Sequence, residues 1–266
     1  MLSEITLGQY FPGNSPIHNL DPRTKLLGTI LYIVAIFLAK STLAYGIVVA
    51  FGLVVLLAAR LPILMVLRSL KPVLFILVIT FLIHAFTYPG EVLWQWKFFT
   101  LTREGLYMGT KIGLRLLLLL LFGGILTFTT SPLMLTDGIE KLLRPFKKIG
   151  LPAHEIAMMM TIALRFIPTL LEETDRIMKA QTARGADFAR GGIAGRAKNM
   201  FSLMVPLFVG AFRRADELAI AMEARCYHGG EGRTRMYELR YHKGDYIAYV
   251  IMLLLVAAVI LCKWEF

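Results

Sequence analysis

The chain has 266 residues, of which 57% are hydrophobic and only 18% are charged. A soluble domain usually carries about a quarter charged residues, so this composition excludes an ordinary water-soluble protein and points to a lipid bilayer as its environment. The formal charge of +11 comes from 29 Lys and Arg against 18 Asp and Glu. No basic patch is interleaved with aromatic residues as base stacking requires, so we expect no nucleic-acid partner.

Apolar runs of helical length recur along the chain. A hydrocarbon core about 30 Å thick needs about 20 helical residues. Several of the runs are shorter, and flanking Lys and Arg side chains that snorkel to the interface can make up the difference. We predict five membrane spans within an all-α integral membrane protein: Leu26–Ala39, Thr42–Ala59, Pro72–Phe86, Gly109–Thr130 and Tyr246–Cys262.

The basic loop residues predict the orientation in the cell membrane. The turn between the second and third runs holds Arg60, Arg68 and Lys71 and no acid, so it should be cytoplasmic. The N-terminus and residues 131–245 are then cytoplasmic, whereas residues 87–108 and the C-terminus lie outside. Four basic residues oppose this orientation: Lys97, Arg103, Lys111 and Arg115.

The sequence divides into N-terminal spans (1–130), a cytoplasmic module (131–245) and a C-terminal span (246–266). Within the module, residues 133–149 predict a helix capped by Thr136. Residues 153–184 and 201–226 predict two long amphipathic helices, each apolar at the membrane end and charged at the far end. The charges near the end of the first are expected to form a solvated face: Glu172, Glu173, Asp175, Arg176 and Lys179.

The two long helices end in similar motifs. The first ends in Ala183-Arg184-Gly185 and the second in Ala224-Arg225-Cys226, each preceded by an aspartate at the same spacing. An arginine at a helix tip can bind a carboxylate with both arms of its guanidinium, and a small alanine lets another backbone approach. One such motif is commonly ordinary helix capping, but two copies on the predicted cytoplasmic side indicate docking.

The third residue of each motif decides how the helix ends. Gly185 can adopt a left-handed C-cap conformation, which would stop the first helix and leave Arg184 at its tip. Cysteine disfavours that conformation. We therefore expect the second helix to continue through Tyr227 and to stop at Gly229-Gly230.

These features resemble the transmembrane T subunit of energy-coupling factor (ECF) transporters, which is related to the cobalt-uptake permease subunit. The opening residues look like the family's opening signature: Gly8-Gln9-Tyr10, Pro12-Gly13-Asn14-Ser15, His18, Leu20 and Asp21-Pro22-Arg23-Thr24-Lys25-Leu26. The paired Ala-Arg-Gly motifs are its other hallmark, and Cys226 is a departure from them.

The resemblance implies a non-catalytic coupling subunit whose two helix tips bind two ABC ATPase subunits. A separate substrate-binding membrane subunit, the S component, would then capture a vitamin or another micronutrient. Arg184 and Arg225 would each enter a groove on one ATPase, and the S component would pack against the apolar faces of residues 131–170 and 201–212.

Other functions remain open at this point. One is a dedicated cobalt or nickel ECF permease subunit, and another is a membrane-embedded lipid-head-group transferase, which would need clustered acidic residues beside the spans. An ordinary ABC permease would supply short coupling loops instead of two long helices. The sequence has no phosphate-binding loop, HExxH motif or nucleophile elbow, so we expect no catalytic residue, cofactor or metal site and assign ATP hydrolysis to partner chains.

Overall fold

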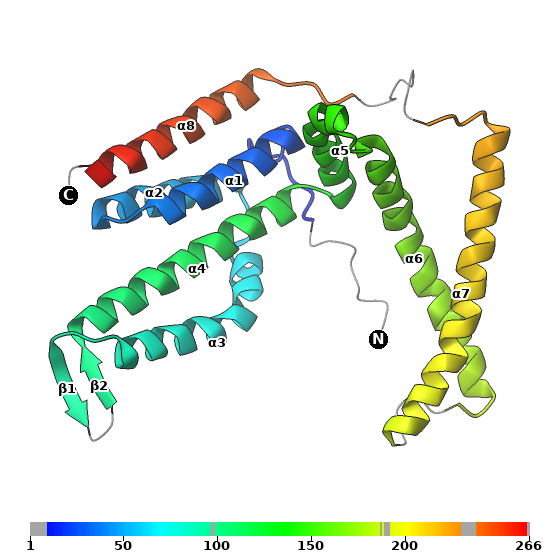
Figure 1. Cartoon of the computed structure of the whole chain (residues 1–266), viewed down its shortest axis with the longest axis horizontal. Coiled ribbons are helices and arrows are strands. Elements are labelled where there is room, and N and C mark those ends of the chain that lie inside the picture. The colour runs from blue at the N-terminus through cyan, green and yellow to red at the C-terminus, as the bar shows by residue number, and fades with distance from the viewer. Residues whose placement is uncertain (1–9, 97–98, 187, 189–191, 230–237, 265–266) are drawn as a thin grey trace. The chain divides into compact units, whose positions relative to one another are not determined.

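The computed structural model describes all residues except 1–9, 97–98, 187, 189–191, 230–237 and 265–266 (Figure 1). Gly8, Gln9 and Gly230, named above, lie outside the described residues. The chain divides into two compact units. We call Gly8–Gly138 with Leu239–Phe266 the bundle unit, and Ile139–Glu238 the long-helix unit. The division of the sequence at residues 130 and 245 was made on functional grounds and stays a prediction.

The bundle unit consists mainly of helices. They are α1 (Pro22–Leu38), α2 (Thr42–Ala59), α3 (Ile63–Thr87), α4 (Arg103–Thr129) and α8 (Lys243–Trp264). The long pair α3 and α4 packs together, as does the pair α1 and α8. An antiparallel hairpin of β1 (Val92–Trp96) and β2 (Phe99–Thr102) joins α3 to α4. The aromatic and β-branched residues of this segment favour strands.

The long-helix unit is built on α6 (Ala153–Ala183) and α7 (Ile193–Ala224), preceded by the short 3-10 helix η1 (Arg144–Ile149). Helix α5 (Pro132–Leu143) leads into this unit. Thr136 lies inside α5, where its hydroxyl donates to the carbonyl of Pro132, so the prediction that it caps the helix is wrong. The cap is Ser131, whose hydroxyl accepts from the backbone N–H of Met134, because an N-cap side chain must precede the first turn.

Within the described residues, five helices are long and apolar enough to cross a membrane: α2, α3, α4, α6 and α8. An all-α, multi-pass membrane protein is therefore confirmed. Helix α1, a predicted span, has 17 residues and is not among the five, so its crossing stays a prediction. Helix α6, predicted as an amphipathic helix of the cytoplasmic module, qualifies by length and composition because its first half is apolar, and its place in that module also stays a prediction.

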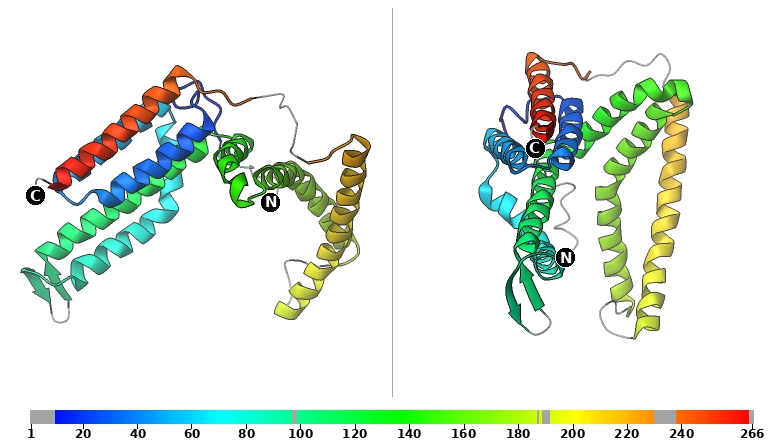
Figure 2. Two further views of the ribbon diagram at one scale, coloured as in Figure 1. Left: turned by 45° about the horizontal axis from the view of Figure 1, so that its top comes forward. Right: turned by 60° about the vertical axis from the view of Figure 1, so that its left-hand side comes forward.

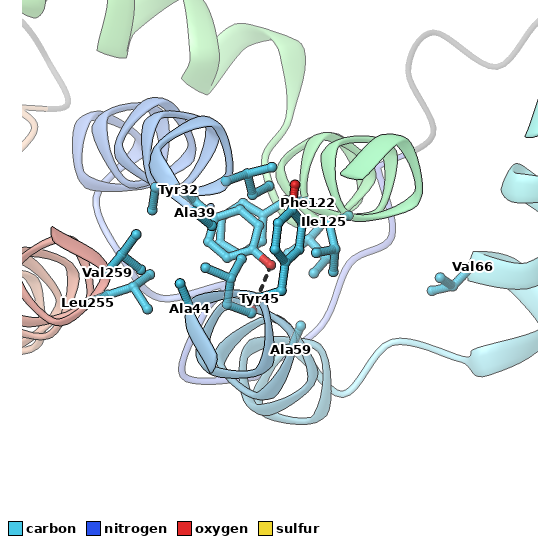
Figure 3. Close-up of a cluster of buried hydrophobic side chains, with 14 of the residues drawn as sticks. Tyr32, Ala39, Ala44, Tyr45, Ala59, Val66, Phe122, Ile125, Leu255 and Val259 are labelled. Carbon is cyan, nitrogen blue, oxygen red and sulfur yellow. Dashed lines mark hydrogen bonds between the residues drawn. The ribbon is translucent and has the colours of Figure 1, made fainter. Parts of the chain in front are cut away.

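The core of the bundle unit is centred on Tyr32 of α1 (Figure 3). Its ring stacks on that of Phe122 from α4, with 3.9 Å between the centroids. The phenol is fully buried and donates a 3.0 Å hydrogen bond to the carbonyl of Val48 on α2. A buried hydroxyl without a partner would be costly, so this bond fixes how α1, α2 and α4 pack.

We expect Gly52→Ala to destabilise the bundle unit. A Cβ at Gly52 would lie 2.5 Å from the Tyr32 hydroxyl, which cannot move without losing its bond to Val48. Overpacking of this kind costs about 1–3 kcal/mol. Gly46→Ala on the same helix is the matched control, because a Cβ there meets nothing within 4 Å. In thermal unfolding of the purified chain in detergent, the melting temperature should fall for Gly52→Ala and not for Gly46→Ala. Equal melting temperatures would contradict this packing.

Candidate functional site

The tip of α6 ends at a left-handed glycine, as predicted. Gly185 has φ +90° and follows the last helical residue, Ala183, and the C-cap Arg184. Two backbone bonds close the end: the N–H of Gly185 donates to Thr182 O (2.9 Å) and that of Ala186 to Gln181 O (3.0 Å). This pair of bonds is the Schellman motif. It directs the chain away from the helix axis and leaves Arg184 at the tip.

The tip of α7 has the same geometry, although its third residue is a cysteine. Cys226 has φ +55°, and α7 ends at Ala224 with Arg225 as its C-cap. The N–H of Cys226 donates to Glu223 O (2.8 Å) and that of Tyr227 to Met222 O (3.0 Å). The prediction that this helix continues through Tyr227 is therefore wrong. A left-handed non-glycine residue costs roughly 1–2 kcal/mol, which two backbone hydrogen bonds can offset.

Both tips present an arginine to solvent beside small residues. Arg184 and Arg225 are exposed, as are Ala183 and Ala224. Within the part of the chain that the structure describes, neither guanidinium has a side-chain hydrogen bond or an ion-pair partner. Both cations are thus free to bind a carboxylate supplied from elsewhere, and the alanines leave room for its backbone.

The two tips lie at opposite ends of the helix pair, because α6 and α7 are antiparallel (Figure 1, Figure 2). The amide of Gln181, near the end of α6, donates to Ser202 O, near the start of α7. From Ser202 to the end of α7 the helix rises about 33 Å at 1.5 Å per residue. The charged end of one helix therefore lies beside the apolar start of the other. The two tips can therefore bind at two separate places on one partner, or bind two partners.

An ion pair joins the helices where they pack. Glu173 of α6 and Arg214 of α7 are in contact, and both side chains are only partly exposed. Gly210 lies at the same place, where a Cβ would approach the Glu173 carboxylate to 3.0 Å. Glu173 was predicted to belong to a solvated face, but α7 covers part of it and leaves its side chain 26% exposed. The ion pair is one of the contacts by which α6 and α7 pack together.

We expect the backbone preference of the residue at position 226 to matter more than its side-chain chemistry. Cys226→Gly should keep or raise stability, since glycine adopts φ +55° without strain. Cys226→Val should unravel the last turn of α7, because a β-branched residue is a genuine outlier there. Hydrogen exchange at the backbone amides of residues 226 and 227 measures directly whether the two hydrogen bonds that end α7 are intact. Faster exchange in both variants would contradict the prediction, and Cys262→Val is the control.

A second polar centre lies in the bundle unit, at the start of α1. Asp21 caps α1 and Pro22 occupies its first turn. Lys25 is 8% exposed and donates to His18 O and Thr129 O, both at 2.9 Å. Asp245 was missed. It is fully buried at the start of α8 and accepts from the backbone N–H groups of Asp21 and His242, both at 2.8 Å.

The signal for this centre was an acid directly before the last apolar run. With Asp21, Arg23 and Lys25 near the first run, an aspartate at the start of another span indicates a buried charge that needs partners. The Arg23 guanidinium binds both carboxylate oxygens of Asp21, at 3.0 and 2.8 Å, and lies 3.9 Å from the centre of the Tyr241 ring. This centre fastens α8 to α1.

The described residues contain no group of three or more potential metal ligands. With this fold and two cationic helix ends, the chain is a multi-pass helical membrane protein with a candidate protein-docking site. The profile of the CbiQ family, described as "Cobalt transport protein", matches residues 13–236. The chain therefore belongs to the CbiQ family of transport proteins.

The chain is also similar to curated proteins over its whole length. It is 62% identical over 264 residues to the energy-coupling factor transporter transmembrane protein EcfT of Acidaminococcus fermentans, covering 99% of this chain and 98% of that protein. Identity to the proteins of the same name is 49% over 266 residues in Ruminiclostridium cellulolyticum, covering all of both chains. In Bacillus subtilis it is 46% over 258 residues, covering 97% of each.

Proposed function

We propose that this chain is the transmembrane coupling subunit of an ECF-type ABC importer, which transmits ATPase motion to a separate substrate-binding membrane subunit. The observation that carries the proposal is the pair of exposed, unpaired arginines at two identical Schellman-capped helix ends. The family and the printed names of the relatives support the class of protein.

The geometry of the tips supports two ATPase partners. Each tip offers one free guanidinium with flanking alanines, which suits a groove that contains a carboxylate. Because the tips lie at opposite ends of a pair about 30 Å long, each can enter a separate groove. When two ATPases close on ATP, each would pull one tip, and the ion pair between Glu173 and Arg214 would carry that force across the helices.

The apolar first halves of α6 and α7 are the proposed seat of the S component. Large side chains on α7 stay strongly exposed: Phe201 (66%), Val205 (58%), Phe208 (57%) and Phe212 (69%). Met159 on α6 is also exposed, at 58%. Methionine adapts its shape to different partners, so this surface suits several S components with different vitamins or micronutrients.

Basic residues support a cytoplasmic location for the tips. More than half of the 29 Lys and Arg residues fall within residues 131–245, and cytoplasmic segments carry the excess of Lys and Arg. The N-terminus would be cytoplasmic too. ATP hydrolysis is then assigned to the partner ATPases, which have access to cytoplasmic ATP.

The family's description as a cobalt transport protein favours one alternative, a permease subunit dedicated to cobalt or nickel. Copurification separates the two functions. A tagged chain expressed in its own host should retain two ATPase chains together with several different small apolar subunits under different vitamin limitations. One small subunit under all conditions would support the dedicated permease, and a chain that retains no ATPase would overturn the proposed function.

A further inference from the structure

Three basic residues gather at the end of the bundle where α1 gives way to α2. Lys111 of α4 donates from its ammonium group to the carbonyl of Lys40, the residue between the two helices. Arg115 lies one turn further along α4, with its guanidinium 5.3 Å from the centre of the Phe37 ring and 5.9 Å from that of Tyr45. We call Lys40, Lys111 and Arg115 the cation cluster. Lys111 and Arg115 are two of the four basic residues that oppose the predicted orientation.

The acids nearest in sequence to the cation cluster are engaged elsewhere. Between Asp21 and Asp137 the sequence contains only two acidic residues, Glu91 and Glu104. Glu104 accepts from the backbone N–H of Glu91, and Glu91 lies 3.8 Å from Arg103. Within the described residues, no member of the cluster forms an ion pair. Cations that lack a counter-charge are costly near hydrocarbon, so the cluster is suited to bind an anion.

Two buried polar atoms, one in the cation cluster and one beside it, also lack a hydrogen-bond partner among the described residues. Among the described residues, the Tyr45 hydroxyl and the Arg115 Nε are buried without a hydrogen-bond partner, and Tyr45 is only 6% exposed. The Lys111 ammonium lies 5.1 Å from the centre of the Tyr45 ring and 5.4 Å from that of the Tyr107 ring. The Tyr107 hydroxyl is 3.2 Å from the hydroxyl of Thr42. Tyrosines beside basic residues are typical of the level of the lipid headgroups.

The position of the cluster along the bundle agrees with that level. Lys25 at the start of α1 donates to Thr129 at the end of α4, and Lys111 contacts Lys40 at the other end. Eighteen residues separate Lys111 from Thr129, a rise of about 27 Å, close to one hydrocarbon thickness. The two polar regions thus bracket the apolar core of the bundle.

We propose that the cation cluster binds the phosphate of an anionic phospholipid such as phosphatidylglycerol. The phosphate accepts from Lys111 and Arg115, and the acyl chains follow the exposed apolar faces of α1 and α2. The proposed orientation places this lipid in the outer leaflet. The other parts of the proposal do not depend on that orientation. The lipid offsets the charge that otherwise draws this end of the chain toward the cytoplasmic side.

Native mass spectrometry of the complex, released from nanodiscs with equal phosphatidylglycerol and phosphatidylcholine, tests the site. The wild type should retain phosphatidylglycerol in excess. The double variant K111Q/R115Q should retain it about 25-fold less, since each cation at an anionic surface contributes about fivefold. R68Q/K71Q, a basic pair outside the cluster, is the control and should match the wild type. K111R/R115K keeps the charge and should keep most of the excess.

Three results would overturn the proposal. The double variant could retain the lipid as the wild type does. Excess inorganic phosphate could displace the lipid, which would indicate a site for free anions. The excess could appear only when the S component is removed, which would indicate that a partner carboxylate occupies the cluster. Because assembly with ATPases is scored in the same spectra, failure of this site and failure of the proposed function are distinguishable.

Discussion

Arg184→Ala and Arg225→Ala should each release an ATPase from the complex and abolish substrate uptake. Each arginine is exposed and unpaired at a rigid helix end, ready to form a forked bond with a carboxylate. Truncating such a residue at an interface typically costs about 2–5 kcal/mol, a loss of at least about 30-fold in affinity. Uptake should stop after either substitution, because paired ATPases must close together. Pull-down of the tagged chain and a vitamin uptake assay in cells measure the two effects.

Two arginines on the same helices provide matched controls. Arg176 on α6 and Arg213 on α7 are also exposed but lie away from the tips. Arg176→Ala and Arg213→Ala should assemble and transport as the wild type does. Arg184→Lys should retain an amount of ATPase between those of Arg184→Ala and the wild type, because an ammonium group cannot form the forked bond. If the tip variants and the controls retain equal ATPase, the arginine tips are not the docking site.

Asp245→Asn should strongly destabilise the bundle unit. The carboxylate is fully buried and accepts from two backbone N–H groups, one of them at the start of α1. An asparagine has one acceptor oxygen, so its amide group would face the N–H of Asp21 or of His242, and the nearly buried Lys25 would lose a nearby negative charge. Removing one partner from a buried charged network costs about 3–5 kcal/mol.

Thermal unfolding in detergent and hydrogen exchange at the start of α8 measure this loss. The matched control is Glu91→Gln, because the Glu91 side chain is 76% exposed and its contact with Arg103 is equally exposed. Exposed ion pairs contribute about 0–1 kcal/mol, so this variant should melt as the wild type does. A wild-type melting temperature for Asp245→Asn would show that α8 is held to α1 by apolar packing alone.

The helix ends show how far local sequence determines the candidate site. Ala183, Arg184 and Gly185 form the predicted tip because a glycine C-cap is a local, backbone-level signal. The same rule gave a wrong prediction at Cys226. Its intrinsic preference is against φ +55°, but the Schellman bonds of the last turn outweigh that preference. The candidate site was predicted from the sequence, and the end of one of its two helices was predicted incorrectly.

Contacts between distant residues were harder to predict. The antiparallel pairing of α6 with α7 buries Glu173 against Arg214, and nothing within α6 indicates this pairing. Asp245 meets the start of α1 across more than 200 residues of sequence. Composition and periodicity located the helices, but they do not specify which helix faces which. The β1–β2 hairpin was also not predicted, because short strands depend on packing with their neighbours.

Labelling of Cys226 tests the central claim most directly, namely that two helix tips bind ATPases from the cytoplasm. Cys226 is exposed beside Arg225, and Cys262→Ser would leave it as the only thiol of the chain. A membrane-impermeant maleimide should label Cys226 in inverted vesicles stripped of ATPases, but neither in intact cells nor after the ATPases are added back. Labelling from outside intact cells, or labelling that the ATPases leave unchanged, would contradict the claim.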